Sequence, residues 1–323
     1  MEYLQAGPHG TLGERSRELA AVARGDEAPD AVVRNGDLVN VHTAEIQPGV
    51  DLHVAAGRIA RVVPTGEADE AIGEATQVVD ADGAYLAPGF LDGHVHIESA
   101  MVTATGFARG VVPHGTTGIF ADPHEIGNVL GLEGVRTLLD EAAGLPLKVL
   151  HTVPSCVPAA PGFSDAGAEI DADDVAAALE WDETVALGEM MDYPGVIGGD
   201  REVHEKLAAT YDAGLVAQGH FPEPETDAQR DAYVAAGVSS DHETVSRGDA
   251  LAKLRAGMWT MLRQGSAWHD VPETIKAITE ADADPRHLLL VADDIHPGTR
   301  ATSTARSGRP SATASIPSRR SGR

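Results

Sequence analysis

The sequence predicts an α/β protein in which a TIM-like (β/α)8 barrel follows a small N-terminal β domain. Short apolar runs alternate with amphipathic stretches from residue 85 onward, eight such runs occur, and polar side chains gather at one end of them. Eight β/α units in series is the count of a TIM barrel. An open doubly wound sheet is the alternative, but no GxGxxG motif follows the first run.

The first predicted domain spans residues 1–87. An amphipathic helix is expected over 14–28. The segment after it alternates short Val- and Ile-rich runs with Gly, Asn and Pro turn signals. That alternation is typical of a small β meander.

The predicted barrel occupies residues 88–297 and is incomplete at its C-terminal end. Amphipathic helices are expected at 171–181, 201–214 and 247–257. The expected strands are 85–92, 115–122, 148–155, 184–191, 214–221, 236–243, 257–264 and 287–294.

The composition changes abruptly in residues 298–323. This segment carries six arginines, no acidic residue and a single large apolar residue, Ile316. A basic disordered tail is one interpretation. We favour another, in which the break marks a truncated or frameshifted C-terminal part.

The overall charge is strongly acidic, with 50 Asp and Glu against 24 Lys and Arg and a formal charge of −26. Such a surface repels phosphates, which argues against a nucleic-acid partner. The composition suits a protein of a salt-loving cell, although an acidic mesophilic enzyme is the alternative.

Two further features concern location. No run of eighteen apolar residues and no basic start followed by an apolar stretch occurs, so we expect neither a membrane span nor a secretory signal. The lone Cys156 fits a reducing, cytoplasmic location.

Titratable side chains recur where the expected strands end. They are His94, His96, Asp122, His124, Glu125, Glu189, His220, Asp241, His242, Glu243, Asp293 and Asp294. In a TIM barrel these strand ends converge on the face that carries active sites. Any one of these groups alone has a structural explanation, such as a helix cap or a hydrogen-bonded loop histidine. Their joint placement favours a shared site.

His94 and His96 are the strongest pair in this set. Residues i and i+2 of a strand point to the same face, so both imidazoles project side by side. Imidazole together with carboxylate is a ligand set for Zn, Mn or Fe. Two cations that share a carboxylate can hold a hydroxide ready at neutral pH. The pair is therefore predicted to supply the first two ligands of a metal centre.

Longer motifs resemble those of the amidohydrolase superfamily and, within it, the adenine deaminase family. The stretch PGFLDGHVHIES marks the superfamily, whereas ADPHEIGNVLG and GEMMDYPGVI are specific to the adenine deaminases. Other matching stretches are HTVPSCVPAAPGF, SSDHE and VADDIHP. The resemblance is close over residues 80–297 and looser before them.

The resemblance implies a binuclear Mn²⁺ or Fe²⁺ centre in which Glu189 bridges the two cations. The implied metal ligands are His94, His96, Glu189, His220, His242 and Asp293. The implied catalytic residues are Asp293, which takes the proton of the attacking hydroxide, and His242 and Glu243, which polarise the reacting groups or relay the proton. Asp122, His124, Glu125 and Asp294 are implied as substrate-binding or accessory groups.

The implied reaction is hydrolysis of adenine, a small-molecule substrate, to hypoxanthine and ammonia, and the resemblance also implies a homodimer. Two alternatives stay open. One is another cyclic amidohydrolase, for example a dihydroorotase-like ring opener, although that class brings a lysine where Glu189 stands. The other is an inactive remnant. Ile295 stands where the family usually has an arginine, and residues 298–323 replace a closing helix and a further domain.

Overall fold

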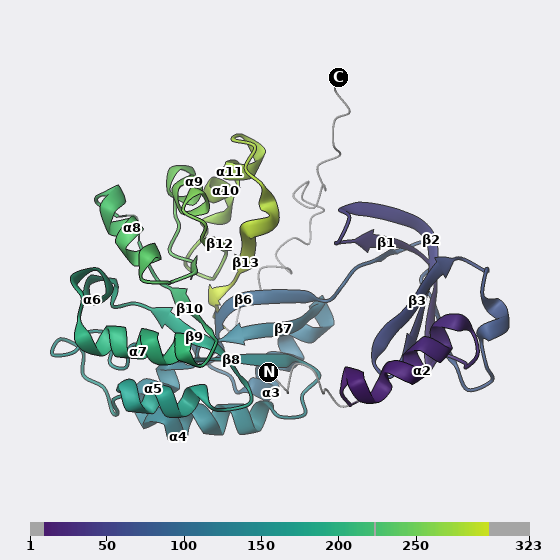
Figure 1. The fold of residues 1–323 in the computed structure, drawn as a ribbon, viewed down its shortest axis with the longest axis horizontal. Coiled ribbons are helices and arrows are strands. Elements are labelled where there is room, and N and C mark those ends of the chain that lie inside the picture. Colours follow the sequence, from purple (N-terminus) through teal and green to yellow (C-terminus); the bar gives the residue numbers. More distant parts are fainter. Residues whose placement is uncertain (1–9, 223, 297–323) are drawn as a thin grey trace. The chain divides into compact units, whose positions relative to one another are not determined.

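The structure is a computed structural model that describes residues 10–222 and 224–296. The chain divides into two compact units, one ending at Pro88 and one beginning at Gly89. Figure 1 shows the elements of both units. The segment 298–323, predicted as a tail, lies outside the described residues.

A helix and a five-stranded sheet form the N-terminal unit. The helix α2 (Leu12–Arg24) begins earlier than the predicted 14–28, because Thr11 and Glu14 form a capping box. It ends at Gly25, whose φ of 83° is left-handed. The strands are β1 (Ala31–Asn40), β2 (Glu45–Ala55), β3 (Arg58–Pro64), β4 (Gln77–Asp80) and β5 (Tyr85–Leu86), with the 3-10 turn η1 (Asp69–Ala71) between β3 and β4.

The predicted meander describes only part of this sheet. Strands β1, β2 and β3 pair antiparallel in series, as a meander does. Strands β4 and β5 instead return to pair parallel with β1. The bulges in β1 between Val33 and Leu38 accompany the change of partner along that strand.

The second unit is built on parallel strands that match the eight expected ones. One sheet has the order β10-β9-β8-β7-β6-β14 and the other β11-β12-β13. Their bounds are β6 (Phe90–His96), β7 (Thr116–Ala121), β8 (Lys148–Val153), β9 (Thr184–Met190), β10 (Val216–Gly219), β11 (Ser240–Asp241), β12 (Trp259–Arg263), β13 (Leu288–Val291) and β14 (Asp293–Asp294).

The pairings of these strands run round in a circuit. A parallel bridge between Ala217 and Val238 joins β10 to the segment before β11. At the other end, β14 pairs parallel with β6 directly after β13. The prediction of an α/β, TIM-like barrel is thereby confirmed.

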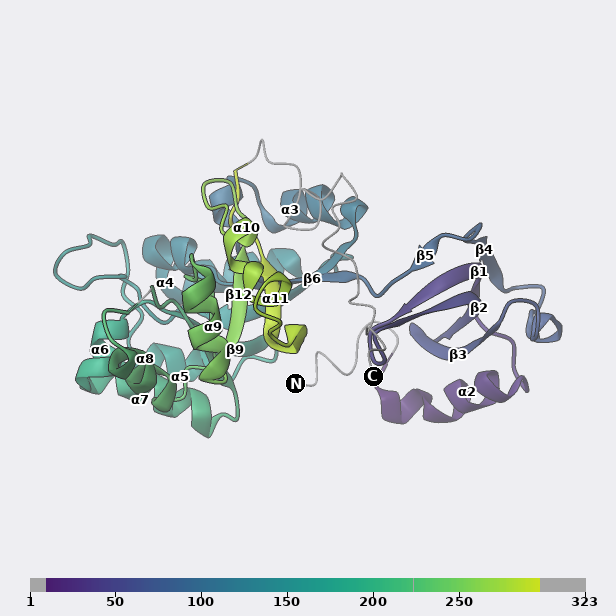
Figure 2. The same cartoon turned by 90° about the horizontal axis from the view of Figure 1, so that it is seen from above.

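Helices lie outside these strands (Figures 1 and 2). The longer ones are α3 (Ala104–Val111), α4 (His124–Ala142), α5 (Ala172–Leu179), α6 (Tyr193–Gly198), α7 (Arg201–Asp212), α8 (Asp227–Ala235) and α9 (Arg247–Arg255). Short turns are η2 (Glu98–Ala100), η3 (Val112–His114), α10 (Val271–Thr274), α11 (Lys276–Thr279) and η4 (Pro285–His287). Two apolar clusters fill the space between strands and helices, one around Leu187 and Leu207 and one around Ile119 and Val135.

The first predicted barrel strand, 85–92, is divided in the structure. Tyr85 and Leu86 belong to the N-terminal sheet, and β6 begins at Phe90. Pro88 has no N–H to offer a ladder, which suits the break between them. His94 and His96 therefore lie within the last three residues of β6 rather than after it.

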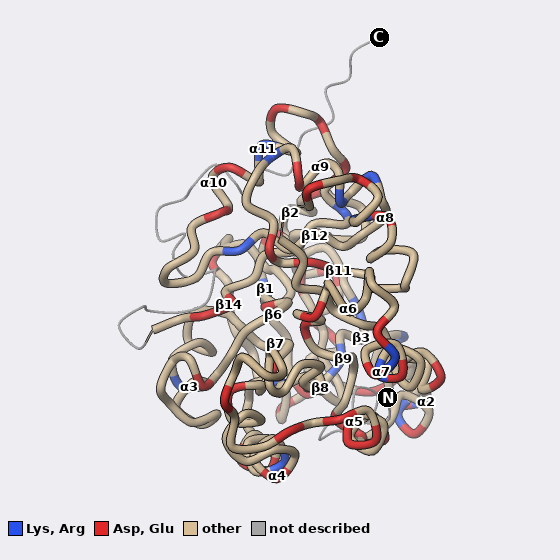
Figure 3. The backbone as a smooth tube through the Cα atoms, turned by 90° about the vertical axis from the view of Figure 1, so that its left-hand side faces the viewer, with Lys and Arg blue, Asp and Glu red and all other residues tan. Residues whose placement is uncertain are grey.

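Two surface features complete the description. Red segments, Asp and Glu, are more frequent than blue segments, Lys and Arg, along the tube in Figure 3. Among the described residues no helix follows β14, and Leu290 on β13 is 45% exposed. None of the helices in this part of the chain is both long and apolar enough to cross a membrane.

Candidate metal centre

Titratable side chains from five parts of the barrel meet at the carboxyl ends of its strands. His94 and His96 lie on β6, Glu189 on β9, and Asp293 on β14. His220 directly follows β10, and His242 directly follows β11. All except His220 are less than 6% exposed. The predicted convergence of strand ends thus brings together every residue of the predicted ligand set.

The two histidines of β6 point into this cluster together. Their Nε2 atoms lie 3.0 Å apart. The other ring nitrogen of His96 lies 2.8 Å from the backbone carbonyl of Asp122, and that of His94 lies 3.4 Å from Oε1 of Gln218. Each Nδ1 therefore has a partner that fixes its ring, which leaves both Nε2 atoms aimed at the same space.

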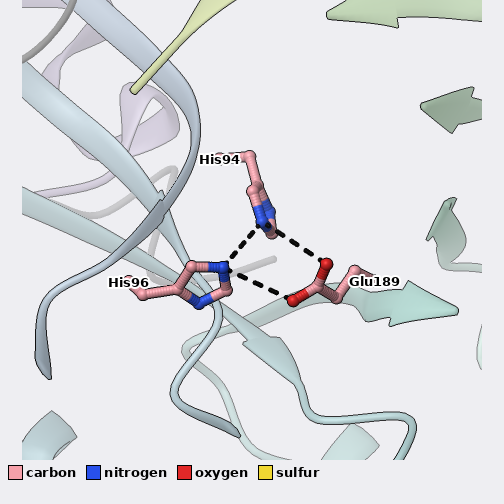
Figure 4. A group of neighbouring side chains, drawn as sticks. All are labelled: His94, His96 and Glu189. Carbon is pink, nitrogen blue, oxygen red and sulfur yellow. Dashed lines mark hydrogen bonds and ion pairs between the residues drawn. The ribbon is translucent and has the colours of Figure 1, made fainter. Parts of the chain in front are cut away.

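The carboxylate of Glu189 lies between the two histidine pairs. Its Oε1 is 3.4 Å from Nε2 of His96, and Figure 4 shows both rings of β6 facing this carboxylate. Its Oε2 is 2.6 Å from Nδ1 of His220 and 3.1 Å from Nε2 of His242. Oε1 thus faces His96, whereas Oε2 faces His220 and His242 and lies 3.9 Å from Nε2 of His94. One carboxylate therefore reaches both pairs.

The local backbone around Glu189 depends on Gly188 and Asp122. Oδ2 of Asp122 accepts the backbone N–H of Glu189 at 2.8 Å. A Cβ at position 188 would lie 2.1 Å from the same oxygen, so glycine is required for this close approach. Asp122, predicted on the substrate side, is buried and faces β9.

Asp293 has an unusual backbone conformation for a residue with a side chain. Its φ is +58°, in the left-handed region, where aspartate is one of the better-tolerated residues. The turn ends β13 and lets β14 pair with β6. Oδ1 of Asp293 comes within 3.2 Å of Nε2 of His96 and 3.9 Å of Nε2 of His94.

Arg263, at the end of β12, is a site residue that the sequence interpretation missed. Its Nη1 donates to Oδ2 of Asp293 at 2.9 Å and also to Glu243. Its Nε donates to Asp270 at 3.1 Å, and its guanidinium lies 4.7 Å from the ring centre of Trp268. Arg263 stands at the end of an expected strand, so the rule that found the other site residues also points to it.

The loop after β12 fits closely against the last strand. A Cβ at Gly265 would lie 2.6 Å from the carbonyl oxygens of both Ala292 and Asp294. The backbone N–H of Ser266 donates to the carbonyl of Asp294 at 2.9 Å. This contact keeps Arg263 beside Asp293.

The remaining predicted residues lie around the same cluster. His124, in the first turn of α4, has Nδ1 3.1 Å from Oε1 of Glu189. Oε2 of Glu125 lies 3.7 Å from Nδ1 of His96. Asp294 lies next to Asp293 on β14 and is half-buried. Glu243 is ion-paired with Arg263 and lies 3.9 Å from both His220 and His242.

Burial and mutual contact shift the pKa values of these groups. Burial and the rings of His242 and His96 lower the pKa of His94 to about 3, so this imidazole is neutral. Burial opposes ionisation of Glu189, yet hydrogen bonds from His124, His220 and His242 hold its pKa well below the usual value. For His96, burial is outweighed by Asp293 and Glu189, which raise its pKa well above the usual value.

The donor set matches what a divalent transition metal needs. The ligand atoms of His94, His96 and Glu189 lie within 4.8 Å of one another, and so do those of Glu189, His220 and His242. Nδ1 of the buried His242 lacks a hydrogen-bond partner, and the nearest partner of its Nε2 is Oε2 of Glu189 at 3.1 Å. A cation placed between this imidazole and this carboxylate would have both as suitable ligands.

A family model for amidohydrolases matches residues 85–303, about two thirds of the chain. The chain belongs to the amidohydrolase family. The match covers every residue of the cluster. It confirms the superfamily part of the resemblance seen in the sequence.

Relatives within this family carry a more specific name. The chain is 54% identical over 288 residues to an adenine deaminase of Moorella thermoacetica, and 49% identical over 288 residues to one of Clostridium botulinum. Each match covers 89% of this chain but 48% of the relative. The chain therefore spans about half the length of the curated relatives it matches.

A solved structure supports the fold. Atrazine chlorohydrolase from Arthrobacter aurescens TC1, complexed with zinc, superposes with a TM-score of 0.57 at 15% identity. The match covers 81% of this chain and 72% of that one. At this identity the likeness bears on the fold alone.

Proposed function

We propose that this amidohydrolase removes the exocyclic amine of adenine, with two divalent cations held by the cluster, to give hypoxanthine and ammonia. The observation that carries the proposal is the placement of Glu189, whose single carboxylate lies beside both histidine pairs. The identity to an adenine deaminase extends over 89% of the chain. Glu189 also disfavours the lysine-bridged class of cyclic amidohydrolase.

The first cation would be held by His94, His96 and Asp293, and the second by His220 and His242. Glu189 would serve both. Bound cations would lower the pKa of a water molecule and polarise it for attack at neutral pH. Mn²⁺ or Fe²⁺ suits this mixture of imidazole and carboxylate.

The protein's own groups would handle the protons. Asp293 has one oxygen towards the cluster and the other bound by Arg263, so it is oriented to accept the proton of the attacking water. The water oxygen adds to C6 of the purine, the double bond between C6 and N1 opens, and N1 takes up the proton that Asp293 accepted. The second proton passes from the new C6 hydroxyl to the leaving amine, with His242 and Glu243 as the neighbouring relay, and ammonia departs as the C6 carbonyl forms.

The flanking titratable groups would act on the substrate side. His124 and Glu125 lie at the start of α4, half-buried and beside the cluster, where they can meet the ring. Asp294 lies beside Asp293. For Asp122 we propose an accessory role through Glu189, because its carboxylate binds the backbone of that residue.

We also propose that the enzyme works in the cytoplasm of a salt-rich cell, as a homodimer. The acidic excess supports the salt-rich setting, and the lone Cys156 supports the reducing compartment. Activity that rises with KCl concentration would agree with the first of these statements.

The test is ammonia release from adenine by the 323-residue chain, in high salt with Mn²⁺ added. Guanine and dihydroorotate serve as comparison substrates. Adenine-dependent release that a chelator abolishes is the expected result. Turnover of dihydroorotate instead would favour the ring-opening alternative, and two bound cations without any turnover would favour an inactive remnant.

A further inference from the structure

Behind the second histidine pair lies a buried ammonium group, that of Lys253 on α9. Its Nζ donates to the carbonyl of Phe221 and to Oδ2 of Asp241, both at 2.7 Å. It also lies 2.8 Å from Oδ2 of Asp249. The side chains of Lys253 and Asp241 are both 0% exposed. The chemistry proposed above uses neither of them.

The partners of Lys253 adjoin the two histidines in the chain. Phe221 follows His220, and Asp241 precedes His242. Oδ1 of Asp241 accepts the backbone N–H of Phe221 at 2.5 Å, so one carboxylate already joins the two segments. The ammonium of Lys253 joins the same two segments a second time, because it donates to the carbonyl of Phe221 and to the carboxylate of Asp241.

The backbone alone joins these segments weakly. A single bridge, between Ala217 and Val238, connects β10 to the segment before β11. The strand β11 itself has two residues. The relative position of His220 and His242 therefore depends on side-chain contacts more than on a β ladder.

We propose that Lys253 and Asp241 are positioning residues for the second cation, because they hold His220 and His242 at the separation that one shared cation requires. This inference rests on the proposed function only for the presence of that cation. Outer partners of metal ligands commonly change metal affinity by about 10- to 100-fold when they are removed.

The first test is Lys253→Met, which keeps the unbranched side chain up to Cε and removes the ammonium. Mn²⁺ alone is the probe, and elemental analysis after dialysis counts the cations per chain. We expect wild-type protein to retain two and Lys253→Met to retain one. In calorimetric titration, the dissociation constant of the second cation should rise by about 10- to 100-fold.

The matched control is Lys206→Met. Lys206 is also buried, but its Nζ donates to the carbonyls of Ser155 and Ile170, outside the segments of the two histidines. This variant should retain both cations. Loss of the second cation in both variants would show a general effect of removing a buried ammonium and would overturn the specific role of Lys253.

A milder pair of variants covers the case in which Lys253→Met does not fold. Oγ1 of Thr244 donates to Oδ2 of Asp241 at 3.0 Å, whereas the buried Oγ of Ser240 has no hydrogen-bond partner. Thr244→Val should weaken the second cation by several-fold, and Ser240→Ala should leave it unchanged. Equal affinities in the two variants would overturn the proposal.

The outcomes separate the inference from the proposed function. Two cations at wild-type affinity in a folded Lys253→Met protein would overturn the positioning role alone. Two cations in wild-type protein without adenine turnover would overturn the substrate assignment and leave the positioning role supported by the variants. Fewer than two cations in wild-type protein would overturn both.

Discussion

The two halves of the proposed metal centre are built in different ways. His94 and His96 come from one strand, and the pleat alone places their rings on one face with Nε2 atoms 3.0 Å apart. His220 and His242 follow two different strands, β10 and β11, and a single bridge joins β10 to the segment before β11, with a buried ion pair behind the two histidines. The backbone of a single strand fixes the relative position of two side chains on it, whereas two side chains on different strands are positioned by tertiary contacts.

The supporting carboxylates differ in the same way. Asp92 lies beneath the first pair, where its Oδ1 accepts the N–H of Ala292 at 3.0 Å and that of His94 at 3.4 Å. No lysine or arginine pairs with it among the described residues, and burial raises its pKa to about 7. Asp241 lies beneath the second pair and binds the ammonium of Lys253. Of the two histidine pairs, only the second thus has a charged pair beneath it.

The largest effect is expected from Glu189→Gln, which removes the one charge that both halves share. An amide keeps the shape but supplies one weak oxygen ligand and a donor where both oxygens face imidazoles. We expect cation binding to weaken in both halves. The rate of deamination should fall on the order of 10³-fold, which corresponds to an activation free energy that is higher by several kcal/mol. Steady-state kinetics and cation counting measure the two effects.

The control for that variant is Glu180→Gln, an exposed glutamate at the end of α5. It should leave both quantities unchanged. Retention of two cations and full turnover in Glu189→Gln would contradict the shared ligand, and loss of one cation only would assign Glu189 to a single half.

The next largest effect is expected from Arg263→Gln. Asp293 would lose the donor that holds its Oδ2, and Glu243 would lose its ion pair. Misplacing a general base lowers kcat and has a smaller effect on KM. We expect kcat to fall by about 10²-fold while both cations stay bound. The matched control is Arg136→Gln, which breaks a half-exposed pair with Glu183 on the outer side of the barrel. An unchanged kcat in Arg263→Gln would contradict a role of Arg263 in orienting Asp293.

How much of this centre could be predicted follows from the same difference. His94 and His96 could be found from spacing alone, because the period of a strand fixes where both rings point. Glu189, His220, His242 and Asp293 could be found from their position at strand ends, because a barrel brings those ends together. Arg263 obeyed the same rule but was not recognised, since an arginine binds no metal.

Other parts could not be read from local pattern. The contacts of Lys253 depend on how α9 packs beneath Phe221 and Asp241, which no spacing in the sequence encodes. The parallel return of β4 and β5 to β1 depends on pairings between residues over 40 positions apart, whereas the turn signals between them indicate only a change of direction. The start of β6 was misplaced because the apolar run continues through Pro88.

A histidine outside the centre shows what burial does without a cation. His151 on β8 is 0% exposed, neither ring nitrogen has a hydrogen-bond partner, and the ring stacks 5.9 Å from Trp181. Burial lowers its pKa from 6.5 to about 4. The folded state therefore binds this proton less readily than the unfolded state, so stability present above pH 6.5 is lost as the pH falls towards 4.

The variant His151→Phe should remove that loss. Between pH 8 and pH 5 the linkage amounts to about 2 kcal/mol of unfolding free energy, which the variant would no longer lose. Urea unfolding at the two pH values measures it, and His114→Phe, at an exposed histidine, is the control. An equal acid loss in wild-type and His151→Phe proteins would show that another group is responsible.

The smallest effect separates the two halves most directly, by comparing Asp241→Asn with Asp92→Asn. At position 241 an amide can still accept from Phe221, but its NH₂ would face the ammonium of Lys253 and the hydroxyl of Thr244, both donors. We expect the second cation to bind about tenfold more weakly, a difference of about 1.4 kcal/mol.

At position 92 an amide oxygen can replace the accepting oxygen, and the other oxygen has no hydrogen-bond partner to lose. Affinity for the first cation should then change by less than about twofold. Equal losses in the two variants would mean that the first half also depends on a charged support, and that one strand is not enough to fix a pair of ligands.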